Sequence, residues 1–258
     1  MAVVVPKELV DLALRPSGRP GPGIVVDRTP ERVVTLHPNF PIPGPNSVSQ
    51  IRCAPDRVAP MVAEARALGD RHGLRFMWIL DPDAEPADLP ERLAALGVAL
   101  EDEVAAMVLP AGADLAPPGA DVELVDALGD LDTFRAAEAA QVEAFGAELA
   151  PGQDGRYTDN RDDPRRHFLL ARLDGEAAGA GWATVFEDGV FMNGGAVRAR
   201  FRGRGVYRAL VAARLELARR TAAPGLAVQA RLDTARPILA RLGFTEVGRV
   251  RMFAERGA

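Results

Sequence analysis

A short basic turn between a strand and a helix constrains the fold of this chain more than any other feature. An apolar run that suits a buried strand ends at Val197, and apolar residues then recur at helical spacing up to about Thr221. The turn itself contains Arg202, Gly203, Arg204 and Gly205. The first turn of a helix leaves N–H groups unpaired at the positive end of the helix dipole, and glycines let a ligand approach closely. The segment therefore predicts a cradle for a pyrophosphate, to which the arginines add charge-assisted hydrogen bonds.

The rest of the C-terminal half predicts a mixed α/β sheet. Asp174-Gly175 and Asp188-Gly189 each separate two runs of β-type residues, as in type I′ hairpins, so we expect an antiparallel three-stranded meander. Before the meander, Asp130 or Asp132 is expected to form the N-cap of the one or two helices over 131–149. The expected strands cover 122–125, 168–173, 177–186, 190–197, 226–229 and 246–254, and the expected helices cover 131–149, 206–221 and 234–242.

A stretch rich in Pro, Gly and Ala divides the chain. Residues 110–119 lack a periodic apolar pattern, which is typical of a linker. We therefore predict an N-terminal domain over 1–110, a linker over 111–120 and a C-terminal domain over 121–258. A second irregular stretch, 37–46, has too many prolines for a helix or a central strand and is expected to be an ordered surface loop.

The N-terminal half contains a faint copy of the end of the chain. Residues 90–98 resemble residues 237–244, since each segment is an amphipathic helix that ends in Leu-Gly. An apolar strand precedes each helix, and a strand containing Met107 or Met252 follows it. We interpret this as a tandem arrangement whose first copy has degenerated; a chance likeness between two helices that end in Gly is the alternative. Only the second copy has the basic turn, so only it is expected to bind a nucleotide cofactor.

The basic turn resembles the acetyl-CoA-binding motif of the GNAT superfamily, Arg/Gln-x-x-Gly-x-Gly/Ala. Here the motif is Arg200-x-x-Gly203-x-Gly205, and the Leu-Gly-Phe at 242–244 resembles the closing signature of that family. The resemblance implies a GNAT-like acyl-CoA N-acyltransferase fold over 121–258. It also implies that the N-terminal half is a partial GNAT-like domain, as in tandem GNAT proteins with a degenerate partner. A Rossmann site would need a third glycine and an acidic residue, and a P-loop would need Gly-Lys-Ser/Thr.

The same resemblance implies acetyl-CoA as cosubstrate and assigns its contacts. The backbone groups of Ala196 and Val197 would pair with the pantetheine arm as an added strand does. The backbone amides that would hold the pyrophosphate belong to Arg202, Gly203, Arg204, Gly205, Val206 and Tyr207. Tyr207 stands where the family commonly has a small residue, and it either narrows the cofactor entrance or packs against the next helix.

The sequence matches the catalytic residues of the family less completely than its cofactor-binding motif. Many GNAT enzymes use a Tyr four residues before the Gly of Leu-Gly-Phe as the acid, and Leu239 occupies that position here. The catalytic candidates are Glu143, for which a solvated helix face is the alternative, and Asn193. Asn193 lies in an otherwise apolar strand, so a structural hydrogen bond is its alternative role. Residues 150–157 are expected to form a loop that either closes over an acceptor or merely connects two elements.

The composition excludes several other classes of protein. The formal net charge of −5 argues against a general nucleic-acid binder, although the four arginines at 198–204 keep phosphate-backbone binding as a minor alternative. Cys53 is the only cysteine, and the three histidines show no metal-ligand spacing, so we expect neither a disulfide nor a metal site. The N-terminal segment lacks a signal pattern, and no apolar run approaches the roughly 18 residues of a membrane span. These features favour a soluble, cytoplasmic protein.

Together these observations predict an acetyl-CoA-dependent N-acetyltransferase that acts on the amine of a small molecule by direct attack on the thioester. Because the expected acid is missing, a catalytically weak or inactive acyl-CoA-binding or regulatory protein is the alternative. Acceptor recognition lies in loops that vary freely on a given fold, so the sequence leaves the acceptor open. It also leaves the oligomeric state open, a homodimer included.

Overall fold

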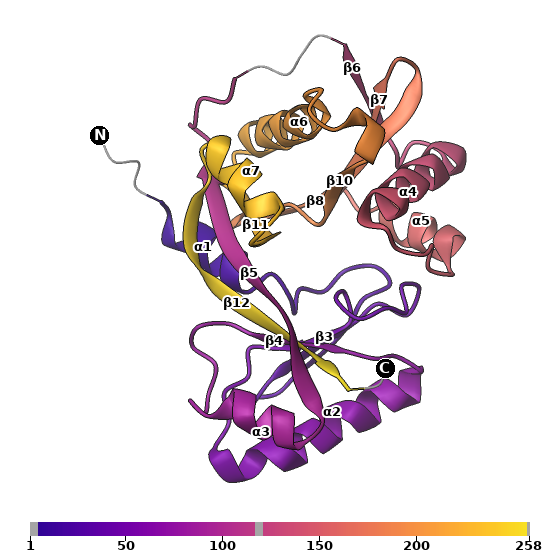
Figure 1. Cartoon of the computed structure of the whole chain (residues 1–258). Coiled ribbons are helices and arrows are strands. Elements are labelled where there is room, and N and C mark those ends of the chain that lie inside the picture. The colour runs from indigo at the N-terminus through magenta and orange to yellow at the C-terminus, as the bar shows by residue number, and fades with distance from the viewer. Residues whose placement is uncertain (1–4, 117–120, 257–258) are drawn as a thin grey trace.

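A computed structural model describes residues 5–116 and 121–256 and places its strands in one mixed sheet (Figure 1). Neighbouring strands follow the order β1-β2-β3-β4-β12-β5-β11-β9-β8-β7-β6, and β10 pairs with β8 outside this path. The strands are β1 (Val25–Arg28), β2 (Val33–Leu36), β3 (Ser47–Ser49), β4 (Met77–Leu80), β5 (Val98–Pro110), β6 (Val122–Asp126), β7 (Arg166–Leu173), β8 (Glu176–Phe186), β9 (Gly189–Phe191), β10 (Gly195–Val197), β11 (Gly225–Arg231) and β12 (Thr245–Glu255). The helices are α1 (Lys7–Leu14), α2 (Val58–His72), α3 (Leu89–Ala95), α4 (Leu131–Phe145), α5 (Gln153–Arg161), α6 (Val206–Arg220) and α7 (Ala235–Arg241), with short 3-10 helices η1 (Pro55–Arg57) and η2 (Ala199–Phe201).

The two halves of the chain exchange long strands. β5, from the N-terminal half, pairs antiparallel with β11, and β12, from the C-terminal end, pairs antiparallel with β4. β5 and β12 also pair with each other, so the centre of the sheet runs β4-β12-β5-β11 (Figure 1). Each half therefore fills a position in the strand order of the other, and one sheet continues through both.

The faint copy seen in the sequence, residues 90–98 against 237–244, corresponds to the same order of elements in both halves. The first unit is β4-α3-β5, and the second is β11-α7-β12. The domain division around 111–120 stays a prediction. Pro110 is the last residue of β5, and Arg219 donates hydrogen bonds of 2.9 and 2.7 Å to the carbonyl oxygens of Ala111 and Ala113. Residues 117–120 of the expected linker lie outside the described residues.

Helices α4 and α6 cover opposite faces of the meander because side chains alternate along β7. Phe168 and Leu170 pack in one core cluster with residues of α4 such as Phe134. Ala171 and Leu173 pack in another cluster with residues of α6 such as Leu210. The expected cap of α4 is present, since the side chain of Asp130 accepts a hydrogen bond of 2.8 Å from the N–H of Thr133.

Three local expectations were wrong. The third strand of the meander is not continuous over 190–197, because it divides into β9 and β10, and Asn193 lies in the gap rather than inside a strand. The first hairpin does have the positive φ values expected of a type I′ turn, 54° at Asp174 and 78° at Gly175, but the second hairpin differs. In the second hairpin Phe186 pairs with Gly189, so the central residues are 187 and 188, and the positive φ falls on Gly189 instead. The expected loop over 150–157 is partly helical, because α5 begins at Gln153.

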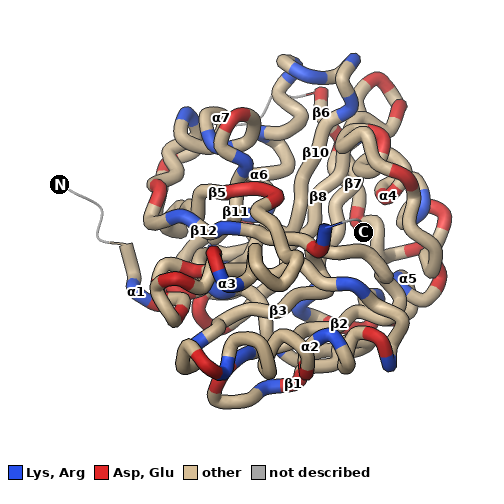
Figure 2. Tube along the Cα trace, turned by 60° about the horizontal axis from the view of Figure 1, so that its bottom comes forward, with Lys and Arg blue, Asp and Glu red and all other residues tan. Residues whose placement is uncertain are grey.

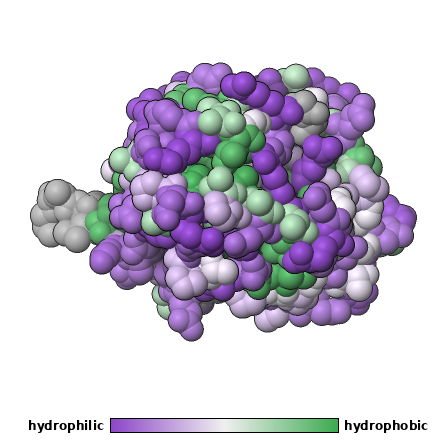
Figure 3. Space-filling view, turned by 90° about the horizontal axis from the view of Figure 1, so that it is seen from below, coloured by the Kyte–Doolittle hydropathy of each residue, from purple (hydrophilic) through white to green (hydrophobic). Residues whose placement is uncertain are grey.

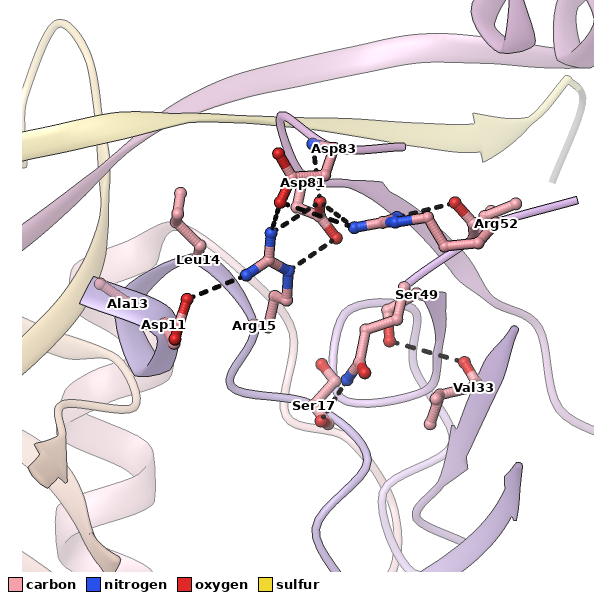
Figure 4. A network of polar contacts seen from close by, with 12 residues as sticks. Asp11, Ala13, Leu14, Arg15, Ser17, Val33, Ser49, Arg52, Asp81 and Asp83 are labelled. Atoms are coloured by element: carbon pink, nitrogen blue, oxygen red, sulfur yellow. Dashed lines mark hydrogen bonds and ion pairs between the residues drawn. The ribbon is translucent and has the colours of Figure 1, made fainter. Parts of the chain in front are cut away.

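Helix α1 lies where the two halves join, against β5, β9, β11 and β12. The segment that follows it is anchored to the end of β4 by an ion-pair network (Figure 4). The carboxylate of Asp81, only 2% exposed, lies 2.6 Å from the guanidinium of Arg52 and 3.4 Å from that of Arg15. Arg15 also pairs with Asp83. This network fixes the start of residues 16–24, which line the cavity described below.

The trace in Figure 2 shows no separation of charge along the described residues. Basic and acidic residues intermingle along the whole trace (Figure 2). The side of the molecule seen from below Figure 1 is mostly hydrophilic, with apolar residues in a broken band between hydrophilic ones (Figure 3). None of the helices in the described residues is long and apolar enough to cross a membrane.

Candidate active site

The basic turn has the geometry of an anion cradle. Gly203 and Gly205 lie in the left-handed region, at φ 78° and 84°, and α6 begins directly after them. Among the described residues, the backbone N–H groups from Gly203 to Arg208 have no hydrogen-bond acceptor. A Cβ added to Gly203 would meet no atom within 4 Å, so the space beside this residue is open. The turn can therefore present a row of donors to a diphosphate at the positive end of α6.

Two arginines of the turn form pairs that a phosphate can replace. Arg204 lies 2.9 Å from Asp174, and Arg200 pairs with Glu176. All four side chains are about half exposed. Exposed ion pairs contribute little to stability, because water screens the charges and the long side chains lose conformational freedom. These guanidinium groups are thus available to an incoming anion at little cost.

Two other arginines join the last turn of α4 to the end of β10. Arg202 donates to the carbonyl oxygens of Val197 at 3.1 Å and Ala144 at 3.3 Å. Arg198 pairs with Glu143 at 2.9 Å. The Glu143 side chain is 59% exposed and does not line the cavity described below. This surface ion pair does not favour Glu143 as the catalytic base, a role that stays a prediction.

Strand β10 has one open edge. Its residues Gly195–Val197 pair with Gly179–Gly181 of β8, and no other described strand pairs with β10. Directly after β10, the N–H of Arg198 donates to the carbonyl of Ala178 at 2.9 Å. In an antiparallel pair, backbone groups point alternately toward the partner strand and away from it. Counting back from Arg198 therefore assigns the direction of each peptide group in β10.

That alternation changes which backbone groups suit the pantetheine arm. Ala196 directs its N–H and C=O toward β8, whereas Gly195 and Val197 direct theirs to the open edge. Of the two residues expected from the sequence, Val197 directs its backbone groups to the open edge and Ala196 does not, and the pantetheine contacts of both stay a prediction. The outward carbonyl of Val197 accepts the hydrogen bond from Arg202, so this side chain has to move for an extended ligand to pair there.

The gap between β9 and β10 leaves two further donors without partners. β9 pairs in parallel with β11, and the N–H of Met192 donates to the carbonyl of Ala227 at 2.9 Å. β10 then leaves β11, and among the described residues the N–H groups of Asn193 and Gly194 have no acceptor. The open edge of β10 therefore has unpaired donors at both ends, the cradle at one and this gap at the other.

A buried arginine lies under the same edge. Arg214 of α6 is 1% exposed, donates to the carbonyl oxygens of Leu210 and Trp182, and has no ion-pair partner among the described residues. Its Nη2 atom has no hydrogen-bond partner there either. A Cβ on Gly195 would lie only 3.3 Å from this guanidinium, so the glycine makes room for it. Burial lowers the pKa of Arg214, yet an arginine stays charged, which makes the potential beneath β10 positive.

A cavity of about 550 Å³ lies between the two halves at the gap. Its N-terminal wall comes from residues 16–24 and from the proline-dense stretch 37–46, and its C-terminal wall from α4, α5 and the meander. Trp182, Phe191, Asn193 and Gly194 all line it. The loop over 37–46 therefore contributes to a binding cavity as well as to the surface.

A chain of hydrogen bonds crosses the cavity wall. Arg166 donates from Nη1 to the hydroxyl of Thr184 at 2.9 Å, and that hydroxyl donates to Oδ1 of Asn193 at 2.7 Å. Because Oδ1 of Asn193 is an acceptor here, its amide nitrogen is the free donor. Sequence reasoning missed Arg166 and Thr184, since no local spacing marks two residues that meet only by pairing of β7 with β8.

His37 lies in the same cavity and stays neutral. Its pKa is lowered to about 4, chiefly by burial and also by the charge of Arg166, while Asp159 opposes both effects. Asp159 accepts a hydrogen bond of 2.7 Å from Asn39. A neutral imidazole beside an arginine does not add positive charge to the cavity.

We expect His37→Gln to reduce the acid sensitivity of the fold. Between about pH 6.5 and pH 4 the unfolded chain binds a proton at His37 and the folded chain does not, so the wild type loses stability as pH falls through this window. The loss attributable to His37 at pH 5 is about 1–2 kcal/mol. Urea unfolding at pH 7.5 and pH 5 measures it, with His72→Gln at an exposed position as the control. An equal loss in wild type and His37→Gln would contradict the assignment.

The structure also shows what surrounds two other positions singled out from the sequence, Leu239 and Tyr207. Leu239 is fully buried in the core cluster that contains α6, α7 and β11, so the structure offers no acid there. Tyr207 is half-buried and packs against that same cluster. Burial raises the pKa of the Tyr207 phenol, and the charge of Arg214 opposes the rise. The packing role of Tyr207 is therefore present, whereas a role at the cofactor entrance stays a prediction.

Comparisons with known proteins agree with this geometry. Residues 134–244 match the family model described as Acetyltransferase (GNAT) family. This part of the chain is a GNAT domain. This family match supports an N-acetyltransferase activity of the EC 2.3.1 class. A comparison with curated proteins found no match.

Solved structures share the fold well beyond the GNAT domain. A GCN5-related N-acetyltransferase from Kribbella flavida is 18% identical with a TM-score of 0.64, over 97% of this chain and 96% of that chain. One from Sphaerobacter thermophilus is 17% identical with a TM-score of 0.60, over 88% and 81%. A tandem GNAT protein from the clavulanic acid biosynthesis pathway is 19% identical with a TM-score of 0.56, over 98% and 89%. The likeness thus includes the N-terminal half.

Proposed function

We propose that this protein is an acetyl-CoA-dependent N-acetyltransferase that acts on the amine of a small molecule. One observation carries the proposal: the open edge of β10 connects the donors of the basic turn to a cavity between the two halves. A nucleotide thioester needs this arrangement, because its diphosphate and its reacting carbon lie at opposite ends of an extended arm. Acetyl-CoA supplies the acyl group that is transferred.

The residues of the chain fit that cosubstrate. The N–H groups from Gly203 to Arg208 would hold the diphosphate, and Gly195 and Val197 would pair with the arm along β10. The buried charge of Arg214 favours electron-rich groups over the edge. Arg202 would exchange its bond to Val197 for a bond to a phosphate.

The chemistry would take place at the gap between β9 and β10. The amine nitrogen would attack the thioester carbon from the cavity, and the N–H groups of Asn193 and Gly194 would stabilise the negative charge that develops on the carbonyl oxygen. The amide nitrogen of Asn193 would add a third donor. As the C–S bond breaks, the proton lost by the amine nitrogen would pass through water to the leaving thiolate, since Leu239 lies in the core and offers no acid.

Thiol release from acetyl-CoA in the presence of a panel of small amines tests the proposal. We expect amine-dependent release in the wild type and a fall in kcat of at least about tenfold in Asn193→Ala, because this variant loses an oxyanion donor. Glu143→Gln is expected to retain at least half of the wild-type rate. A larger loss of kcat in Glu143→Gln than in Asn193→Ala would support Glu143 of α4 as the catalytic base and contradict our assignment of the reacting end.

The second candidate function is binding of acyl-CoA without transfer, and the buried Leu239 favours it. It predicts that calorimetry detects CoA binding while no amine in the panel releases thiol. That pair of results would support a regulatory or carrier role and would reject the enzyme proposed above, while leaving the cofactor site intact.

A further inference from the structure

Arg166 is the cation in the described lining of the cavity that no carboxylate neutralises. The other two arginines of the lining are paired: Arg156 with Glu138 at 2.7 Å and Arg19 with Asp188 at 2.5 Å. The side chain of Arg166 has one hydrogen bond among the described residues, to the hydroxyl of Thr184. A half-buried arginine keeps its charge, so the Arg166 guanidinium is a cation without a direct carboxylate partner among the described residues.

The acidic residue whose charge acts on Arg166 does not pair with it. Asp163 raises the pKa of Arg166, but burial lowers it by more and Arg165 lowers it too. Both oxygens of Asp163 are engaged by Arg165, at 2.9 and 2.8 Å. Arg166 forms no ion pair within the part of the chain that the structure describes.

The free edge of the guanidinium matches a carboxylate. Thr184 occupies Nη1, which leaves Nε and Nη2 of Arg166 as parallel donors on one side of the planar group. Two parallel N–H donors bind the two oxygens of a carboxylate in a bidentate manner. A single guanidinium also balances one negative charge, which suits a carboxylate better than a phosphate monoester of about −1.5 to −2.

Two further features of the cavity indicate which other groups the acceptor has. Asp159 and Glu148 line the cavity without an ion-pair partner among the described residues, so they can attract an ammonium group. Ile42, Phe145 and Leu149 are exposed, at 37%, 57% and 45%, and all three line the same cavity. Exposed apolar side chains grouped at one cavity mark a site for an apolar substituent.

We propose that the acceptor is an amino acid or a similar amino-carboxylate with an apolar substituent, and that Arg166 binds its carboxylate. This inference rests on the proposed function for the transfer step. Thr184 links Arg166 to Asn193, so a carboxylate on Arg166 would lie close to the reacting end of the cofactor edge, where the neighbouring amine has to be. Arg166 acts here as a specificity residue.

Matched pairs of amines test the subsite. Phenylalanine against phenethylamine and leucine against isopentylamine differ only by the carboxylate, and phosphoethanolamine tests a phosphate. We expect kcat/KM with acetyl-CoA to be at least about tenfold higher for the member with the carboxylate. In Arg166→Gln this preference should disappear, because the KM for the member with the carboxylate rises more than the KM for the decarboxylated amine. Arg166→Lys should retain part of the preference, because it keeps the charge without the bidentate edge.

A binding measurement separates failure of the subsite from failure of the enzyme. Calorimetry with N-acetylphenylalanine in the presence of CoA needs no turnover, and wild type should bind it at least about tenfold more tightly than Arg166→Gln does. Equal binding by the two proteins, each shown to bind CoA normally, would overturn the subsite even if amines are acetylated. Binding with the expected difference but no turnover of any amine would support the subsite and reject the transferase. A preference for phenethylamine or phosphoethanolamine in the wild type would also overturn it.

Discussion

CoA binding is expected to fall by at least about 100-fold in Gly203→Glu, which corresponds to about 2.7 kcal/mol. Gly203 has φ 78° and open space beside it, at the start of the row of unpaired N–H groups. A glutamate there would place a carboxylate where the diphosphate has to lie, so both its volume and its charge oppose binding. Isothermal titration calorimetry with CoA measures the effect.

Gly175→Glu is the matched control for this variant. Gly175 also has φ 78° and also has no atom within 4 Å of an added Cβ, but it lies in the hairpin between β7 and β8. It therefore reproduces the backbone strain and the added charge without entering the cradle. We expect Gly175→Glu to bind CoA as the wild type does. Normal CoA binding by Gly203→Glu, or an equal loss of CoA affinity in both variants, would show that the cradle is not part of the cofactor site.

Glu138→Ala is expected to lower the free energy of unfolding by about 3–5 kcal/mol, because it leaves a buried arginine without its counter-charge. The side chains of Glu138 and Arg156 are only 8% and 7% exposed, and two hydrogen bonds of 2.7 and 2.9 Å join them. Arg156 also donates to the carbonyl oxygen of Asn39 at 2.9 Å. The pair thus connects α4, α5 and the loop of the N-terminal half that walls the cavity.

Chemical denaturation monitored by circular dichroism measures this loss, and Glu143→Ala is the matched control. Glu143 lies on the same helix and also pairs with an arginine, but its side chain is 59% exposed. Exposed pairs contribute about 0–1 kcal/mol, so the control should remain close to the wild type. A loss in Glu138→Ala no larger than that in the control would mean that water or a rearranged side chain satisfies Arg156.

The Gly203 and Glu138 variants test two different kinds of feature. The residues of the cradle are neighbours in the sequence, whereas those of the buried pair lie far apart. The cradle consists of neighbouring residues, so glycine spacing, charge and the start of a helix identify it without a structure. The buried pair combines residues 138 and 156 with a carbonyl at residue 39. Only folding brings the loop over 37–46 to α5, and the sequence therefore placed that loop on the surface without indicating its partner.

The sequence by itself determined the local elements of the C-terminal half: the strand, basic turn and helix around Gly203, the cap at Asp130 and the hairpin at 174–175. These depend on residues a few positions apart, where backbone preferences and apolar periodicity act directly. Tertiary structure alone decided the exchange of β5 and β12, the division of 190–197 into β9 and β10, and the position of Arg166 in the cavity. Strand pairing and burial between distant segments govern these features, and no local pattern records which strand will become the neighbour of another.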